Sequence, residues 1–227
     1  MNFIPALEKE FEQNRNVENA FAMSQYMRNK FAFFGIRTTK RRELFKEIWK
    51  QNQQEVHHHS VQIAQTLFDK PEREFHYCAI ELLIKEKKKT YSISDIEWIE
   101  KLILQHSWWD SVDTIAKYIL GAYLQQFPTE TENVITRFSS QESIWLHRSL
   151  ILFQLGYKQK TNSDLLFWLC SKYANSSDFF IQKAIGWALR EYAKTNPEAV
   201  LIFVNSNKLK PLSTKEALKN SGSLKIM

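Results

Sequence analysis

Four small residues recur at intervals of 35 along the chain, and a branched apolar residue follows each of them. The small residues are Ala79, Thr114, Ser149 and Ala184, and their apolar neighbours are Ile80, Ile115, Leu150 and Ile185. A period near 35 with two helices per unit is typical of stacked helical repeats such as HEAT, armadillo and tetratricopeptide arrays. Chance alignment in a helical chain is the alternative, and four units in register without a gap argue against it. We therefore expect an all-α, right-handed solenoid of HEAT-like repeats, with the second helix of each pair on a concave face.

Local signals also favour helices throughout. The chain has only 5 Gly and 5 Pro, too few for the many turns of a β-sandwich or barrel. The capping-box pattern, a Ser, Thr or Asp followed three residues later by an acid, recurs along the chain. These pairs are Asp69/Glu72, Ser94/Glu97, Ser107/Asp110, Thr129/Glu132, Ser139/Glu142 and Ser213/Glu216. We expect about twelve helices joined by short polar turns, forming a single domain over residues 1–227.

Several classes of protein are excluded by what the sequence lacks. No apolar run approaches the ~18 residues of a membrane span, and the acidic residues near the N-terminus are unlike a signal peptide. The two cysteines, Cys78 and Cys170, lie among apolar residues and are expected to be buried thiols. Walker, dinucleotide-binding, nucleophile-elbow and Cys/His metal motifs are missing. We expect a cytoplasmic protein with no membrane contact, no nucleotide cofactor and no metal.

The charge is unevenly distributed. The chain carries 31 basic and 25 acidic residues, a net charge of +6. Residues 1–140 contain 19 of each sign, whereas residues 141–227 contain 12 basic and 6 acidic residues, so the whole surplus lies in the last part. A basic surplus confined to one region is typical of a protein that binds a polyanion such as nucleic acid.

The repeat also aligns a row of residues that precede the small positions. This row consists of Glu43, Cys78, Asp113, Arg148 and Lys183. Trp109 and Trp187 lie four residues from Asp113 and Lys183, on the same helix faces. The tryptophans could simply be core, Asp113 and Arg148 could form an ion pair between repeats, and Lys183 could face solvent. Together they favour a face that binds phosphates and stacks on nucleotides, with a carboxylate suited to a reaction in which positive charge develops.

Other basic or histidine-rich segments are weaker candidates. Thr39, Lys40, Arg41 and Arg42 open a helix whose amides and three cations could hold a phosphate. Lys85 and Lys87–Lys89 end a helix and could complement its dipole or contact phosphate. The run His57–His59 lacks partners at ligand spacing, so we interpret it as solvated surface.

Three segments resemble the AlkD-type DNA alkylation repair family: SWWDSVD (107–113), IWLHRSLILFQLGYKQK (144–160) and FFIQKAIGWALREYAKTNP (179–197). Members are HEAT-like-repeat DNA glycosylases that excise N3- and N7-alkylated purines. The resemblance covers essentially the whole chain and is strongest over residues 69–197. It implies a site on the concave face formed by Trp109, Asp113, Arg148 and Trp187, with Tyr26 as an N-terminal aromatic. Arg190 joins Lys183 and the Lys40–Arg42 run among the expected DNA ligands.

The resemblance implies hydrolysis of the N-glycosidic bond of a cationic purine in double-stranded DNA by a monofunctional, monomeric enzyme, which acts at the nucleoid. Asp113 would stabilise the oxocarbenium ion and orient water, the tryptophans would pack on the sugar, and Arg148 and Lys183 would hold phosphates. A non-catalytic repeat scaffold that binds DNA or a protein is the alternative. An RNA-binding repeat protein is disfavoured, because the aligned row is too heterogeneous to read one base per unit.

Overall fold

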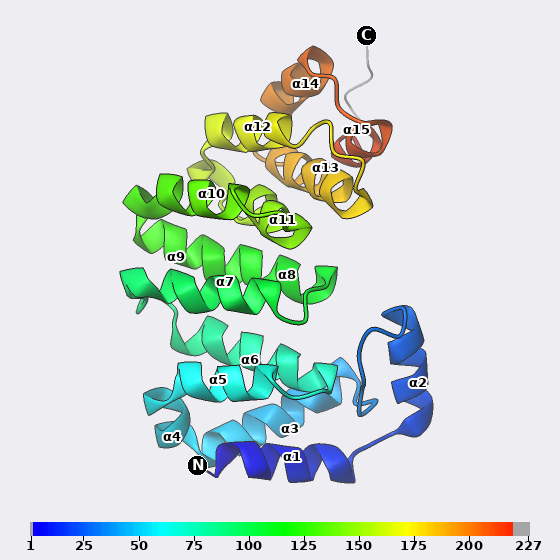
Figure 1. Cartoon of the computed structure of the whole chain (residues 1–227), viewed down its shortest axis with the longest axis vertical. Coiled ribbons are helices and arrows are strands. Elements are labelled where there is room, and N and C mark those ends of the chain that lie inside the picture. The colour runs from blue at the N-terminus through cyan, green and yellow to red at the C-terminus, as the bar shows by residue number, and fades with distance from the viewer. Residues whose placement is uncertain (1, 220–227) are drawn as a thin grey trace. The chain divides into compact units, whose positions relative to one another are not determined.

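All regular structure in the computed structural model, which describes residues 2–219, is helical, apart from an isolated bridge between Ala32 and Glu72. The expected all-α class is thus confirmed, and Figure 1 shows the helices of residues 96–217 stacked in a solenoid-like manner. The contacts divide the chain after Thr90 into two compact units, Met1–Thr90 and Tyr91–Met227. A single domain over the full chain therefore stays a prediction, and each unit is described separately.

The first unit contains six helices. They are α1 (Phe3–Gln13), α2 (Val17–Tyr26), α3 (Thr38–Gln51), α4 (Gln53–His58), α5 (Ser60–Phe68) and α6 (Arg73–Glu86). Helix α1 packs on α3, and α5 packs on α6. Their core is aromatic, with the stacked rings of Phe11 and Phe75 at its centre. The buried Glu74 carboxylate accepts backbone N–H bonds from Phe34, Gly35 and Ile36, and so fixes the loop between α2 and α3.

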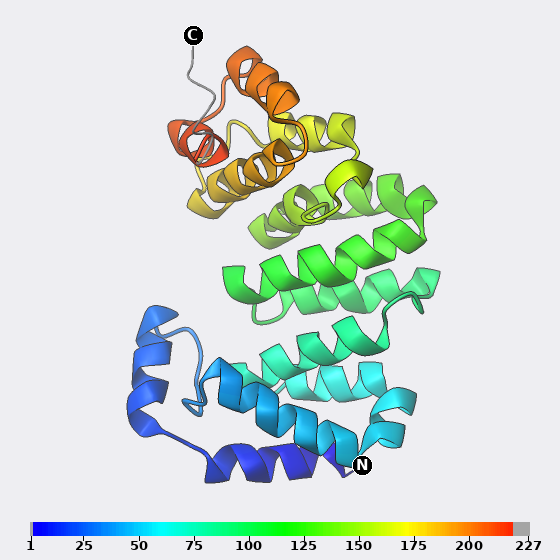
Figure 2. The ribbon, with the colours of Figure 1, turned by 180° about the vertical axis from the view of Figure 1, so that it is seen from behind.

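The second unit contains the remaining described helices. They are α7 (Ile96–Leu104), α8 (Trp109–Ile115), α9 (Gly121–Gln126), α10 (Thr131–Ser139), α11 (Ile144–Leu152), α12 (Ser163–Lys172), α13 (Phe179–Ala193), α14 (Pro197–Ser206) and α15 (Pro211–Ala217). A π-helical segment, Ala116–Leu120, joins α8 to α9. Helix α11 packs between α8 and α13, and α15 packs on α13. Figure 2 shows α8, α11 and α13 from behind, in successive layers.

The predicted repeat is present in the helix positions. Helices α3, α6, α8, α11 and α13 begin at residues 38, 73, 109, 144 and 179, which are 35 or 36 residues apart. The small residues Ala79, Ser149 and Ala184 are fully buried on them. A small side chain at the same place in each second helix lets the layers approach closely, which explains why these positions recur.

Helix starts follow local chemistry, but not always at the predicted residue. Asn196 caps α14, and Pro197 occupies its first position. Ser143, rather than Ser139, caps α11. The predicted box at Ser213 is wrong, because α15 already begins at Pro211.

The cysteines and the apolarity of the helices were both addressed by the sequence. Cys78 and Cys170 are free and fully buried, as expected, and burial raises the pKa of the Cys78 thiol to about 12. None of the described helices combines the length and apolarity that a bilayer crossing requires.

Candidate functional site

Asp113 and Arg148 form a bidentate ion pair in the second unit. Arg148 Nε donates to Asp113 Oδ1 at 2.6 Å, and Arg148 Nη2 donates to Oδ2 at 2.8 Å. Asp113 lies on α8 and Arg148 on α11, at equivalent positions of neighbouring repeats. Two parallel N–H···O bonds fix both the position and the plane of the carboxylate.

This pair is largely removed from solvent. The Arg148 side chain is 5% exposed and that of Asp113 is 12% exposed. Burial raises the pKa of Asp113 above its ordinary 3.8, and the hydrogen bonds and charge of Arg148 oppose that rise. The residual exposure leaves the Asp113 carboxylate as the member of the pair that an external group can approach.

Arg148 also ties the pair to the next repeat. Its Nη1 donates to the backbone carbonyl of Phe180 at the start of α13. Each guanidinium nitrogen of Arg148 therefore has a partner within the protein. These three bonds use three of the five N–H groups of the guanidinium, so the structure shows an internal ion pair, and the phosphate contact expected for Arg148 stays a prediction.

An aromatic cluster lies beside the pair. Trp108, Trp145 and Phe180 contribute rings whose centroids are 5.1–5.6 Å apart. These rings come from the segment before α8, from α11 and from α13, so they connect the three repeats that position the ion pair. The repeat pattern singles out Trp109 alone, although the doublet at 108–109 also contains Trp108.

The two expected site tryptophans are both half-buried. Trp109 begins α8 and lies one helical turn before Asp113, so the two side chains share a helix face. Trp187 lies in the middle of α13, where it packs against the hydrophobic core. It is seven residues, or roughly 10 Å along the helix axis, beyond the carbonyl of Phe180 that Arg148 contacts. Each tryptophan combines a packed part with an accessible part.

Lys183 and Arg190 share one carboxylate, that of Glu216 on α15. Lys183 Nζ lies 2.9 Å from Glu216 Oε1, and Arg190 Nη1 lies 2.7 Å from Glu216 Oε2. Both cations remain partly exposed, at 36% and 25% of their side chains. Sequence reasoning missed Glu216, which it had interpreted as part of a capping box.

The remaining predicted residues lie in the first unit. Tyr26 ends α2 and is 70% exposed, and Lys40 and Arg42 are exposed on α3. Arg41 is buried instead, and it donates to both carboxylate oxygens of Glu81. Arg41 is only 3% exposed and is paired with Glu81, which does not fit the expectation that it binds phosphate.

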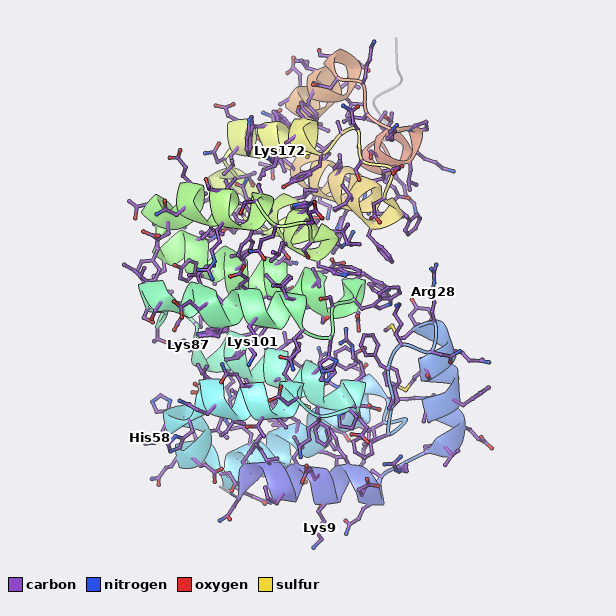
Figure 3. All side chains as sticks on the ribbon, in the orientation of Figure 1. Lys9, Arg28, His58, Lys87, Lys101 and Lys172 are labelled. Atoms are coloured by element: carbon purple, nitrogen blue, oxygen red, sulfur yellow. The ribbon has the colours of Figure 1, made fainter. Side chains whose placement is uncertain are left out.

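Lysines on the outer helices are exposed as well. Figure 3 labels Lys101 on α7 and Lys172 at the end of α12, and both are exposed to solvent. Lys85 lies over the ring of Trp49, 4.1 Å from its centroid, and His57 pairs with Glu86 rather than with a metal-binding set. In the part of the chain that the structure describes, no group of three His, Cys, Asp or Glu side chains is placed to hold a metal ion.

The sequence matches the profile of the family described as DNA alkylation repair enzyme over residues 7–220. The chain belongs to this family. A solved structure, described as a predicted DNA alkylation repair enzyme from Enterococcus faecalis, is 34% identical, with a TM-score of 0.82. That similarity covers 92% of this chain and 98% of the other. No curated protein matches. Membership of this family implies that the substrate is DNA and that the process is DNA alkylation repair.

Proposed function

We propose that this protein is a DNA glycosylase that hydrolyses the N-glycosidic bond of N3- and N7-alkylated purines in double-stranded DNA. The observation that carries the proposal is the Asp113 carboxylate, held by two bonds from Arg148 and placed one turn from Trp109. A non-catalytic scaffold does not require a desolvated carboxylate beside indole rings. A reaction in which positive charge develops does require one, because the carboxylate stabilises that charge.

The chemistry starts from a leaving group that is already activated. Alkylation at N3 or N7 makes the purine cationic, so it departs as a neutral base without a strong general acid. As the C1′–N bond lengthens, positive charge builds on the deoxyribose. Asp113 stabilises this oxocarbenium ion and accepts a proton from the water that attacks C1′. The electron-rich faces of Trp109 and Trp187 add cation–π attraction to the sugar.

Arg148 is a positioning residue in this scheme. Its fork of donors fixes the carboxylate plane, and its third bond to Phe180 anchors that fork to α13. Because each of its three nitrogens already donates to a group of the protein, we assign Arg148 to positioning rather than to phosphate binding. Phosphate binding falls to Lys183, Arg190, Lys40 and Arg42, which remain accessible, and Tyr26 offers an exposed ring.

The leaving-group argument can be tested with a panel of duplexes. We expect release of the cationic bases 7-methylguanine and 3-methyladenine, and little release of neutral lesions such as uracil, because the proposed mechanism contains no general acid to protonate a poor leaving group. Chromatography of the released bases under single-turnover conditions measures this. Equal release of cationic and neutral bases would contradict the proposed mechanism, and DNA binding without any release would support the scaffold alternative.

We expect a monofunctional enzyme that leaves an intact abasic strand. A lysine that forms a Schiff base at C1′ needs an amine that is free to attack, but Lys183 is paired with Glu216 on a partly exposed face. Borohydride added during turnover should therefore trap no covalent adduct on denaturing gels. An adduct that forms with the wild type and disappears in Lys183→Ala would reverse this assignment.

A further inference from the structure

Glu216 on α15 links two cations of α13 that flank Trp187. Figure 1 shows α15 beside α13, on which it packs. One carboxylate oxygen faces the Lys183 ammonium and the other faces the Arg190 guanidinium. Arg190 Nη1 also donates to the backbone carbonyl of Glu216 at 3.0 Å. Lys183, Trp187 and Arg190 are spaced four and three residues apart, so they lie on one face of α13.

The packing of α15 against α13 determines the position of Glu216. Gly186 lies beneath it on α13, and a Cβ atom at Gly186 would be 2.4 Å from Glu216 Cβ. Ser213 Oγ of α15 donates to the carbonyl of Gln182 on α13 at 3.0 Å. The Glu216 side chain is 12% exposed. These contacts fix the Cβ of Glu216 close to α13, so a phosphate approaching Lys183 and Arg190 meets the carboxylate that already pairs with both.

The carboxylate is charged at neutral pH. The hydrogen bonds from Lys183 and then from Arg190 hold the pKa of Glu216 at about 2. The three side chains thus carry a net charge of +1 rather than the +2 of the two cations alone.

We propose that Glu216 is a built-in counter-ion, which lets Lys183 and Arg190 orient their remaining donors toward DNA while reducing by one the number of phosphates that α13 neutralises. This inference rests on the proposed function, in which α13 contacts duplex DNA. Each neutralised phosphate releases condensed cations, so the effect appears in the salt dependence of binding. Glu216 thereby weakens binding to DNA of any sequence and speeds release after each encounter.

The experiment compares Glu216→Gln with Glu191→Gln on unmodified duplex DNA. Glu191 lies on the same helix and pairs with Lys194, so the control makes the same charge change at another ion pair. We expect the slope of log K against log salt to steepen by about 0.9 in Glu216→Gln. If affinities coincide at 1 M salt, that slope gives about eightfold tighter binding at 0.1 M. The control should keep the wild-type slope, and equal slopes in both variants would overturn the inference.

A second variant guards against an effect of misfolding. Lys183→Gln combined with Glu216→Gln returns the net charge to +1, so its slope should return to the wild-type value. A double variant that keeps the steep slope of Glu216→Gln would contradict the counter-ion role. Because Glu216 is buried against α13, the melting curve of every variant is recorded, and the salt slopes are compared at a temperature at which all of them are folded.

Retention on heparin provides a measurement that is independent of DNA and of base release. On this sulfated polyanion, Glu216→Gln should elute at higher salt than Glu191→Gln. A protein that binds duplex DNA but releases no alkylated base would end the glycosylase proposal and leave the slope comparison valid. Heparin elution in the opposite order would end the counter-ion proposal even if bases are released.

Discussion

Asp113→Asn is expected to lower the single-turnover rate of base release by at least about 100-fold, the usual scale for loss of one electrostatic contact to a transition state. The amide keeps the size of the side chain but has no charge to oppose the oxocarbenium ion and does not accept a proton from water. Affinity for undamaged duplex should change little, because Asp113 does not contact phosphate in the proposed scheme. Rates and affinities are measured below the melting temperature of the variant.

Asp110→Asn is the matched control for this result. Asp110 lies on the same helix, three residues before Asp113, and the substitution removes the same charge from the same segment. We expect near wild-type release with this variant. Loss of activity in Asp110→Asn but not in Asp113→Asn would move the reacting carboxylate to the neighbouring residue.

Arg148→Met is expected to lower the free energy of unfolding by about 3–5 kcal/mol, because it leaves the carboxylate of Asp113 buried without its partner. Urea denaturation measures this as a lower midpoint with an unchanged slope. The double variant Asp113→Leu with Arg148→Met replaces the ion pair by apolar groups and should recover most of the loss. It should release no base, so stability and activity separate.

Two single variants of Arg148 together distinguish a positioning role from a phosphate contact. In Arg148→Lys the charge stays and the bidentate geometry is lost, so base release should fall while the salt dependence of binding stays unchanged. A salt slope shallower by about one counter-ion in Arg148→Met, which removes the charge, would show that the guanidinium neutralises a phosphate. That result would contradict the role derived from its internal hydrogen bonds.

The pH dependence of base release follows from the pKa of Asp113. Burial raises that pKa above 3.8, and release needs the carboxylate, so the rate falls with decreasing pH along a limb whose midpoint lies above 3.8. The stability effect has the opposite sign. The raised pKa favours the folded state below pH 3.8, and this contribution is lost as the pH rises through the folded-state pKa. A single-turnover pH profile, corrected for spontaneous depurination, measures the limb, and a midpoint at or below 3.8 would contradict it.

The repeat could be predicted from sequence because it is a property of packing within and between adjacent helix pairs. Small residues recur every 35 positions where successive second helices approach, so the pattern that predicts the fold also locates α6, α8, α11 and α13. The roles of Asp113 and Arg148 stayed open at that stage. Their alignment in neighbouring repeats permits contact, but side-chain direction decides between an ion pair and two separate ligands.

Arg41 and Glu216 illustrate two kinds of error. The basic run at Lys40–Arg42 suggested a phosphate clamp, yet Arg41 has helical spacing from Leu44, Phe45 and Ile48 and so belongs to the buried face. That signal was available in the sequence. For Glu216, Pro211 indicated that α15 starts two residues before Ser213, but contact with Lys183 and Arg190 depends on how α15 packs over Gly186, which no local pattern reveals.

The most direct test of the glycosylase proposal uses a duplex that carries a single 7-methylguanine in one strand. The protein is incubated in excess over this duplex, and the released base and the strand are analysed separately by mass spectrometry. We predict free 7-methylguanine together with an intact strand that contains one abasic site. Binding of the duplex with no base released from 7-methylguanine or 3-methyladenine would contradict the glycosylase function.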